Sequence, residues 1–356
     1  MTDLASAALR GTVIAANDDF FAAKENLIEP AAPTHAAHTF DGHGQVYDGW
    51  ETRRRRTPGE DWAVVRLGAP GVVRTVVVDT AYFVGNYPPR CAVDATAADG
   101  YPTVDELTDW VPLVAETPLG GDAVHEFPVT DPHRYTHVRL RIRPDGGVAR
   151  LRVHGDPVPD PRDLAGPVDL VAAALGGRAV AASDGFFAPP DNLLLPDPGR
   201  TMGDGWETAR RRTPGNEWVE LALGVPGVPR VAEVDARRFL GNAPGGIRLT
   251  ATDPAGVTLL AETRLQPDTY HRFRLAGDRA VRRVRLDILP DGGLGRLRLY
   301  GTPTADARTA ATLRWWNALP AAHADAVLAH HPADVRQRLR ATRPHSVVPP
   351  EVAALR

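Results

Sequence analysis

The sequence predicts an all-β protein made of two tandem β-sandwich repeats, followed by a short α-helical tail. Three observations lead to this prediction: a long internal repeat, short segments in which apolar and polar residues alternate, and Gly- and Pro-rich turns between those segments. The chain has 356 residues, 43% of them hydrophobic and 24% charged, which suits two globular domains and a tail.

The internal repeat is the strongest of these observations. The stretch Asp48–Trp62, DGWETRRRRTPGEDW, returns as Asp204–Trp218, DGWETARRRTPGNEW. Three more blocks recur in the same order: NDDFFAAKENL with SDGFFAPPDNL, VDTAYFVGNYP with VDARRFLGNAP, and RPDGGVARLRVHG with LPDGGLGRLRLYG. Copy one is longer than copy two between Leu27 and Asp48. Each copy has the length of one domain.

The repeats set the expected domain limits, which are residues 1–156, 168–303 and a helical extension over 304–356. The boundary GDPVPDPRDLAGP holds four prolines, as an extended linker would. In the Ala- and Leu-rich tail, Pro320 and Pro332 suit helix starts, so two or three short helices are expected. Trp315 and Trp316 of this tail would need burial.

Within a copy, most segments have the pattern of strands. Residues 61–68 and 71–80 are Val-rich and are expected to form two strands. In residues 136–142 the apolar side chains at every second position would face the core, and the arginines between them the other side. The order of the segments, ending in an RLRV-type strand, resembles the galactose-binding, discoidin-like jelly roll. That resemblance implies a jelly-roll sandwich in each copy.

Composition narrows the classes of function. A net charge of −3 argues against a nucleic-acid partner, which would usually require a basic excess. The single cysteine, Cys91, excludes an intrachain disulfide and a cysteine metal site, and suits a reducing compartment. The N-terminal MTDLASAALRG lacks the pattern of a signal peptide, and no apolar run has the length of a membrane span. We therefore expect a cytoplasmic protein with no membrane partner.

The arginine stretch allows two interpretations. If it is extended, Glu51, Arg53 and Arg55 share one side and Thr52, Arg54 and Arg56 the other. In copy two the side with the threonine is unchanged. On the side with the glutamate, Ala209 stands at the position of Arg53. The stretch could simply build a corner of the fold. It could also be a clamp, because clustered guanidiniums repel one another unless acids or an anionic ligand compensate them, and a carboxylate ligand would do so.

Other candidate residues are histidines and aspartates. His35, His38 and His43 could bind a divalent metal with Asp41, or lie in a solvated loop. His125 and His271 match between the copies, and either could transfer protons or simply lie on the sheet surface. The aspartates before the Phe-Phe pairs could close turns or balance the arginines; they are Asp18, Asp19 and Asp184. The PDGG segments are turns first, although their glycines would let a ligand approach the backbone.

These motifs together carry a family resemblance. The two arginine stretches, with FFAAKENL, VDTAYFVGNYPP and RPDGGVARLRVHG, resemble the allantoicase family over about residues 10–301. The resemblance implies hydrolysis of allantoate to ureidoglycolate and urea in purine degradation, homo-oligomers, and an open possibility of a divalent metal such as manganese. Arg143 and Leu289 depart from it, because the family usually has an aromatic residue before this proline. The alternative is a non-catalytic sandwich that binds a small carboxylate or sugar.

Allantoate carries a carboxylate and two ureido groups on one carbon, so the candidate residues can be matched to it. An arginine fork would hold the carboxylate, and an acid would accept ureido N–H groups or transfer protons. The predicted substrate-binding residues are Arg53, Arg54, Arg55, Arg210, Arg211, Trp50, Asn86 and Asn242. The predicted catalytic residues are Glu51, His125 and Glu207. Copy one is favoured because it has the extra arginine and the histidine-bearing insertion.

Overall fold

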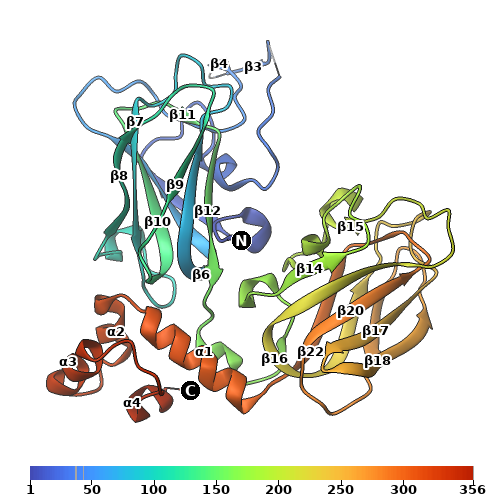
Figure 1. The fold of residues 1–356 in the computed structure, drawn as a ribbon. Helices are drawn as coiled ribbons and strands as arrows, with labels where there is room; N and C mark the ends of the chain where they lie inside the picture. Colours follow the sequence, from blue (N-terminus) through green and yellow to red (C-terminus); the bar gives the residue numbers. More distant parts are fainter. Residues whose placement is uncertain (37, 43, 356) are drawn as a thin grey trace. The chain divides into compact units, whose positions relative to one another are not determined.

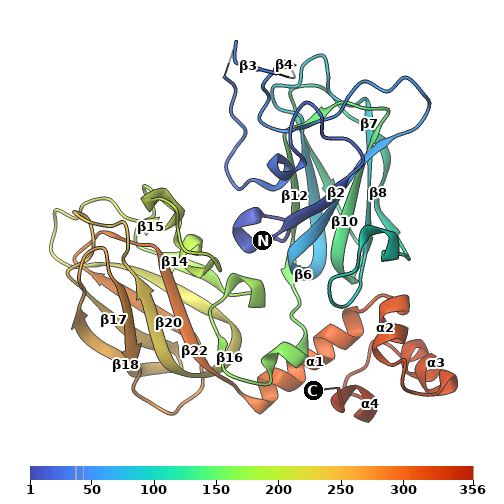
Figure 2. The ribbon, with the colours of Figure 1, turned by 180° about the vertical axis from the view of Figure 1, so that it is seen from behind.

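The chain forms two compact units, each built around one copy of the repeat (Figures 1 and 2). Unit 1 comprises Met1–Val158 and Arg314–Glu351, and unit 2 comprises Pro159–Leu313 and Val352–Arg356. The structure is a computed structural model that describes residues 1–36, 38–42 and 44–355. His43, one of the predicted metal ligands, therefore lies outside the described residues.

The central strand of unit 1 is β6 (Asp61–Asp79). Its first half pairs with β2 (Thr12–Ala16) and β10 (Arg134–Arg143). Its second half pairs with β12 (Arg150–Pro157) and β9 (Val124–Pro128). Because the two halves take different partners, β6 passes from one layer of the jelly-roll sandwich to the other, and both layers contribute to one core.

The remaining strands of unit 1 extend this arrangement, and the described strands pair antiparallel. They are β1 (Thr2–Asp3), β3 (Phe40–Asp41), β4 (Gly44–Gln45), β5 (Trp50–Glu51), β7 (Arg90–Thr96), β8 (Val111–Pro118) and β11 (Gly147–Val148). Short 3-10 helices join them: η1 (Ala7–Leu9), η2 (Lys24–Ile28) and η3 (Val104–Glu106).

Unit 2 repeats the topology around β16 (Glu217–Asp235). Its other strands are β13 (Val168–Asp169), β14 (Arg178–Ala182), β15 (Trp206–Glu207), β17 (Gly246–Asp253), β18 (Ala255–Arg264), β19 (Tyr270–Arg274), β20 (Val281–Leu289), β21 (Gly293–Leu294) and β22 (Arg296–Pro303). Its 3-10 helices are η4 (Pro161–Leu164), η5 (Ala173–Leu175), η6 (Pro190–Leu194) and η7 (Met202–Asp204). The tandem jelly rolls expected from the sequence are confirmed.

One strand prediction differs from the structure. The two strands expected over residues 61–68 and 71–80 are the halves of the single strand β6. Gly68 lies within the strand and does not end it, and a side chain would not fit there, because a Cβ would lie 2.2 Å from the carbonyl oxygen of Leu9. The alternation predicted within β10 is confirmed, because its three core-facing apolar side chains are fully buried; they are Val138, Leu140 and Ile142.

The tail forms four short helices where two or three were expected: α1 (Ala305–Ala318), α2 (Ala321–Val327), α3 (Ala333–Ala341) and α4 (Pro350–Ala353). Pro320 and Pro332 stand at the N-caps of α2 and α3, as predicted. Trp315 and Trp316 are both fully buried. Within unit 1, the Nε2 atom of His323 on α2 lies 2.9 Å from Oδ1 of Asp99, so the tail is tied to the sandwich.

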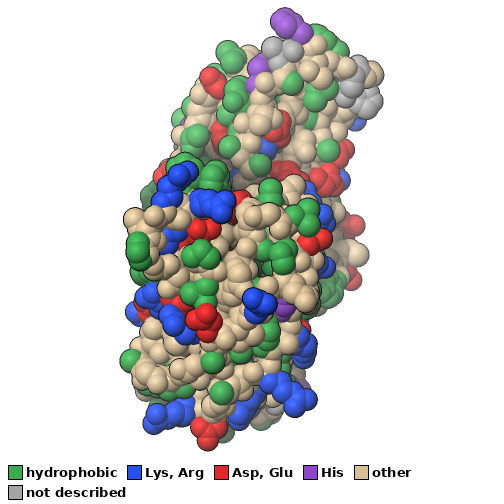
Figure 3. Space-filling model, turned by 90° about the vertical axis from the view of Figure 1, so that its right-hand side faces the viewer, with side chains coloured by type: hydrophobic (Ala, Val, Ile, Leu, Met, Phe, Trp, Pro, Cys, Tyr) green, Lys and Arg blue, Asp and Glu red, His purple; other side chains and the backbone are tan. Residues whose placement is uncertain are grey.

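The surface has a mixed character. Figure 3 shows basic, acidic and apolar side chains intermixed over one face, in keeping with the small net charge of the sequence. None of the helices in the described part of the chain is long and apolar enough to cross a membrane.

Candidate functional site

The arginine stretch of each copy starts from a buried tryptophan. The indole of Trp50 has 0% exposure, and its Nε1 donates a hydrogen bond to the backbone oxygen of Asp18 at 2.8 Å. Trp206 does the same to Asp184 at 2.9 Å. A side chain without solvent exposure cannot touch a ligand, so the prediction that Trp50 binds substrate is corrected: it anchors the corner.

The threonine two residues after this tryptophan also belongs to the corner. Thr52 is buried, and its hydroxyl oxygen accepts a hydrogen bond from the backbone N–H of Gly146 at 3.1 Å. Thr208 repeats the bond with Gly292 at 3.1 Å. These bonds fasten the stretch to the PDGG turn, whose backbone groups would otherwise lose hydrogen bonds on burial. The structural interpretation therefore holds for the tryptophan and threonine positions.

Arg55, one of the predicted substrate-binding residues, pairs with a protein carboxylate. Its guanidinium NH1 lies 2.6 Å from Oδ1 of Asp61, whose side chain is only 2% exposed. Its backbone N–H donates to Oδ2 of Asp145 at 2.8 Å. Because a nearly buried carboxylate needs a charged partner, this ion pair serves the fold.

Arg211, also predicted to bind substrate, repeats this arrangement in copy two. Its NH1 lies 2.7 Å from Oε1 of Glu217, and its backbone N–H donates to Asp291 at 2.8 Å. Sequence reasoning missed these acids as partners of the arginines. The signal was present, since both positions are acidic in both copies.

Arg53 has a partner but remains accessible. Its Nε lies 2.7 Å from Oδ2 of Asp18, its backbone N–H donates to Oδ1 of the same residue at 3.0 Å, and its side chain is 62% exposed. The guanidinium also lies 5.2 Å from the ring centre of Phe20. Burial raises the pKa of Asp18, but the hydrogen bonds from Arg53 outweigh that effect and leave the pKa below its usual value. Asp18 thus balances an arginine, as one of the two alternatives for it expected.

Two of the predicted substrate-binding arginines, Arg54 and Arg210, have free guanidiniums. Arg54 and Arg210 occupy the same position in the two copies and are exposed. Within the described part of the chain, neither forms an ion pair or hydrogen bond through its side chain. The same holds for Arg56 and Arg212. The strict alternation assumed for an extended stretch fails because β5 ends at Glu51 and bonds to Asp18 and Asp145 direct the chain beyond it.

A carboxylate held by an amide lies beside the stretch in both copies. The Nδ2 of Asn86 donates to Oε1 of Glu51 at 2.6 Å, and Asn242 donates to Glu207 at 2.5 Å. All four side chains are partly buried. Burial raises the pKa of Glu51, and the hydrogen bond from Asn86 offsets part of that rise. The structure therefore brings four predicted site residues together as two matching pairs.

The predicted catalytic histidine of copy one is bound by backbone groups. Nε2 of His125 accepts a hydrogen bond from the N–H of Gly120 at 2.8 Å, and its Nδ1 lies 3.1 Å from the oxygen of Val78. In copy two, Nε2 of His271 accepts from the N–H of Gln266 at 2.9 Å. Both ring nitrogens of His125, on β9, thus contact backbone groups, and its assignment as a general acid stays a prediction.

Two histidines of the insertion, His35 and His38, lie within the described residues. His35 stacks on Tyr82 with ring centres 5.3 Å apart, and His38 is exposed in a turn. No three His, Cys, Asp or Glu side chains among the described residues are grouped as metal ligands would be. The metal site stays a prediction, because His43 lies outside the described residues.

Comparison with known proteins agrees with this repeated geometry. A family model described as the allantoicase repeat matches residues 2–158 and again 168–304. The chain belongs to the allantoicase family. A probable allantoicase of Nocardia farcinica is 55% identical over 309 residues, covering 85% of this chain and 94% of the relative. One of Streptomyces coelicolor is 45% identical over 330 residues, covering 87% and 88%.

A solved structure supports the same conclusion at the level of the fold. The crystal structure of allantoicase from Saccharomyces cerevisiae shares 34% of its residues with this chain, at a TM-score of 0.73. The match covers 84% of this chain and 92% of the yeast chain. The family model stops at residue 304, so the helices from α1 onward lie outside the matched repeats.

Proposed function

We propose that this protein hydrolyses allantoate to ureidoglycolate and urea, and that the reaction takes place at the Glu51–Asn86 pair of copy one. The observation that carries the proposal is a partly buried carboxylate, held by an amide, three residues before an arginine with no protein partner in the described chain. The family relationship supports the reaction, and the differences between the copies support the choice of copy one.

Arg53 and Arg54 are the residues proposed to bind the substrate carboxylate. Both side chains are exposed, and Arg53 uses its Nε for Asp18, which leaves its terminal nitrogens for a ligand. A guanidinium fork matches the two oxygens of a carboxylate better than an ammonium does. Asp18 fixes the direction of Arg53, and copy two has Ala209 at the matching position.

Glu51 is proposed to transfer the protons. Asn86 engages only its Oε1, so Oε2 stays available to the substrate. In its neutral form Glu51 gives a proton to the ureido nitrogen as the bond from the central carbon to that nitrogen breaks, and urea leaves. The resulting carboxylate then takes a proton from the water that adds to the imine-like carbon, which restores the neutral acid. Burial favours this role because it brings the pKa of Glu51 upward, toward neutrality.

The test compares Glu51→Gln with Glu207→Gln by urea release from allantoate. We expect kcat to fall by about 10²–10⁴-fold for Glu51→Gln, the usual contribution of a proton-transferring group. In Glu207→Gln the side-chain amide can still accept the hydrogen bond from Asn242. Because the proposed reaction takes place in copy one, this variant should retain most of the activity. Equal losses in two well-folded variants would contradict the assignment to copy one. A wild-type protein that binds allantoate without releasing urea would instead be a carboxylate-binding module.

A homo-oligomer in the cytoplasm remains a prediction of the sequence, and a divalent metal such as manganese remains the open possibility that the family resemblance implies. The first is supported by exposed apolar side chains near both Glu–Asn pairs: Val84 at 70%, Phe186 at 73% and Leu240 at 70%. Surfaces of this kind often mark protein interfaces. Light scattering measures the oligomeric state, and urea release before and after chelation and manganese addition measures the metal dependence.

A further inference from the structure

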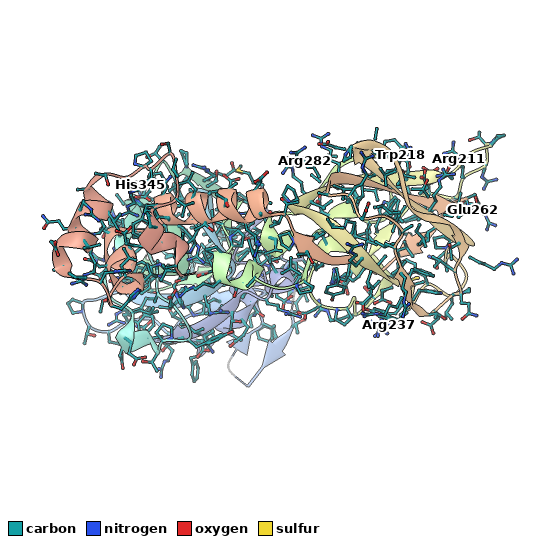
Figure 4. All side chains as sticks on the ribbon, turned by 90° about the horizontal axis from the view of Figure 1, so that it is seen from below. Arg211, Trp218, Arg237, Glu262, Arg282 and His345 are labelled. Atoms are coloured by element: carbon teal, nitrogen blue, oxygen red, sulfur yellow. The ribbon has the colours of Figure 1, made fainter. Side chains whose placement is uncertain are left out.

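Copy two contains a cavity of about 450 Å³ that lies apart from its arginine stretch. Two loop segments line it: one runs from Pro198 to Thr201, and the other supplies Arg237 and Arg238. Figure 4 shows Arg237 well away from Arg211. The volume is in the range of small-molecule sites, about 300–1,000 Å³.

Three arginines line this cavity, and they differ in the ion pairs and hydrogen bonds that they form with the protein. Arg237 forms a two-pronged ion pair with Asp235, at 2.9 and 2.7 Å, and lies 5.1 Å from the ring centre of Tyr270. Its charge is balanced, so it serves as part of the wall.

The other two arginines have terminal nitrogens to offer. Arg238 uses only Nε, which donates to the backbone oxygen of Gly199 at 3.0 Å, and among the described residues its guanidinium has no carboxylate partner. Arg200 is 78% exposed, and its Nε is 3.9 Å from Asp204, beyond hydrogen-bond distance. The remaining acid of the wall, Asp268, accepts the backbone N–H of Arg238 at 2.7 Å. The cavity thus presents the guanidinium of Arg238, which has no carboxylate partner among the described residues, and the exposed guanidinium of Arg200, whose ion pair with Asp204 is long at 3.9 Å.

Copy one shows that the fold does not require these arginines. The positions of Arg237 and Arg238 are Ala81 and Tyr82 there. The turn is shared, since Tyr82 and Arg238 have φ angles of 68° and 73°. In copy one the longer insertion places His35 against the ring of Tyr82, with ring centres 5.3 Å apart. The same backbone therefore carries stacked rings in one copy and guanidiniums in the other.

We propose that this cavity binds a small organic carboxylate, held by the guanidinium forks of Arg200 and Arg238. Two forks on one cavity suit an anion with planar oxygen pairs, because each can donate two parallel hydrogen bonds. The site goes beyond the proposed reaction, which uses the Glu51–Asn86 pair of copy one. The proposed carboxylate site uses only arginines of copy two.

The test measures malonate binding by calorimetry on the full chain. We compare wild type, the double variant Arg200→Ala/Arg238→Ala, and the control Arg282→Ala. Arg282 is 71% exposed in the same unit, and Figure 4 shows it far from Arg237. The double variant should lose at least about tenfold in affinity, as expected for losing charge-assisted hydrogen bonds, while the control keeps it. Unchanged melting of all three proteins by calorimetry verifies the fold.

Three results would overturn the proposal. The first is unchanged malonate affinity in the double variant, and the second is an equal loss in Arg282→Ala, which would show a general effect of net charge. The third is phosphate binding as tight as malonate binding, which would remove the assignment to carboxylates. Urea release by the double variant should stay at the wild-type rate, and a loss of turnover would show that the cavity belongs to the catalytic site. Absence of urea release by the wild type would refute the proposed function and leave the malonate result standing.

Discussion

In both repeats a buried tryptophan, a buried threonine and an arginine paired with an acid hold the same corner of the sandwich. The surroundings of that corner differ: copy one adds Arg53 and an insertion with stacked rings, and copy two has Ala209 and an arginine-lined cavity. Features kept in both copies follow from the shared fold, whatever else they do. The features found in one copy only are the ones that a specific function has to explain.

The strongest test of the shared corner is to remove its tryptophans. Trp50→Ala and Trp206→Ala should each lower the free energy of unfolding of the unit that carries them by about 3–5 kcal/mol, since a large cavity replaces a buried ring. Chemical denaturation of the two variants measures this. A large loss in one copy with almost none in the other would show that the two corners are not equivalent.

The ion pairs of the corner come next. Arg55→Ala leaves the carboxylate of Asp61 buried without its partner, and we expect it to lower the free energy of unfolding by about 2–3 kcal/mol, less than for a fully buried pair because Arg55 is 26% exposed. Arg211→Ala should act in the same direction. The control Arg54→Ala should stay within about 0.5 kcal/mol of wild type in the same denaturation experiment. If Arg54→Ala proved as destabilising as Arg55→Ala, the division of the stretch into structural and free arginines would be wrong.

The arginine unique to copy one gives a kinetic test. Arg53→Ala should raise KM for allantoate about tenfold with a small change in kcat, because it removes ground-state binding of the carboxylate. Ala209→Arg adds the matching arginine to copy two and should leave both constants near their wild-type values. Steady-state urea release measures both variants, and a gain in turnover from Ala209→Arg would mean that copy two can be made catalytic.

The smallest expected effect concerns stability and pH. Burial raises the pKa of Glu51, so the folded protein binds this proton more tightly than the unfolded chain does. The protonated carboxyl therefore contributes to the free energy of unfolding at low pH, and wild type loses that contribution as pH rises through the raised pKa. Glu51→Gln has no such loss and should be slightly more stable than wild type at neutral pH. The difference should shrink as pH falls below the pKa of an unfolded glutamate. Denaturation across this pH range measures it, and a difference that grows toward acid would contradict the direction.

The sequence predicted the fold well because the fold depends on local patterns that occur twice. The recurring blocks and the alternation in β10 required only neighbouring residues. The continuity of β6 could not be predicted, because Gly68 and Pro70 have the composition of a turn and only their partners show that the strand continues.

The candidate site was less predictable because its geometry depends on distant residues. Glu51 and Asn86 are 35 positions apart in sequence, and Arg55 meets Asp145 at a separation of 90. The sequence predicted Arg54 and Arg55 alike as substrate-binding residues, and the contacts distinguish them, because only Arg55 pairs with a protein carboxylate. A pattern within one segment cannot show which acid from another loop will reach each arginine.

The pairing of β1 with β12 places the start and the end of copy one side by side, with Thr2 opposite Gly155. In copy two, Val168 lies opposite Gly301 in the same way. A unit whose ends meet can be copied in tandem without rerouting any strand, since the second copy begins where the first one finishes. A gene that encodes such a unit can therefore double by tandem duplication without a change in the topology of either copy.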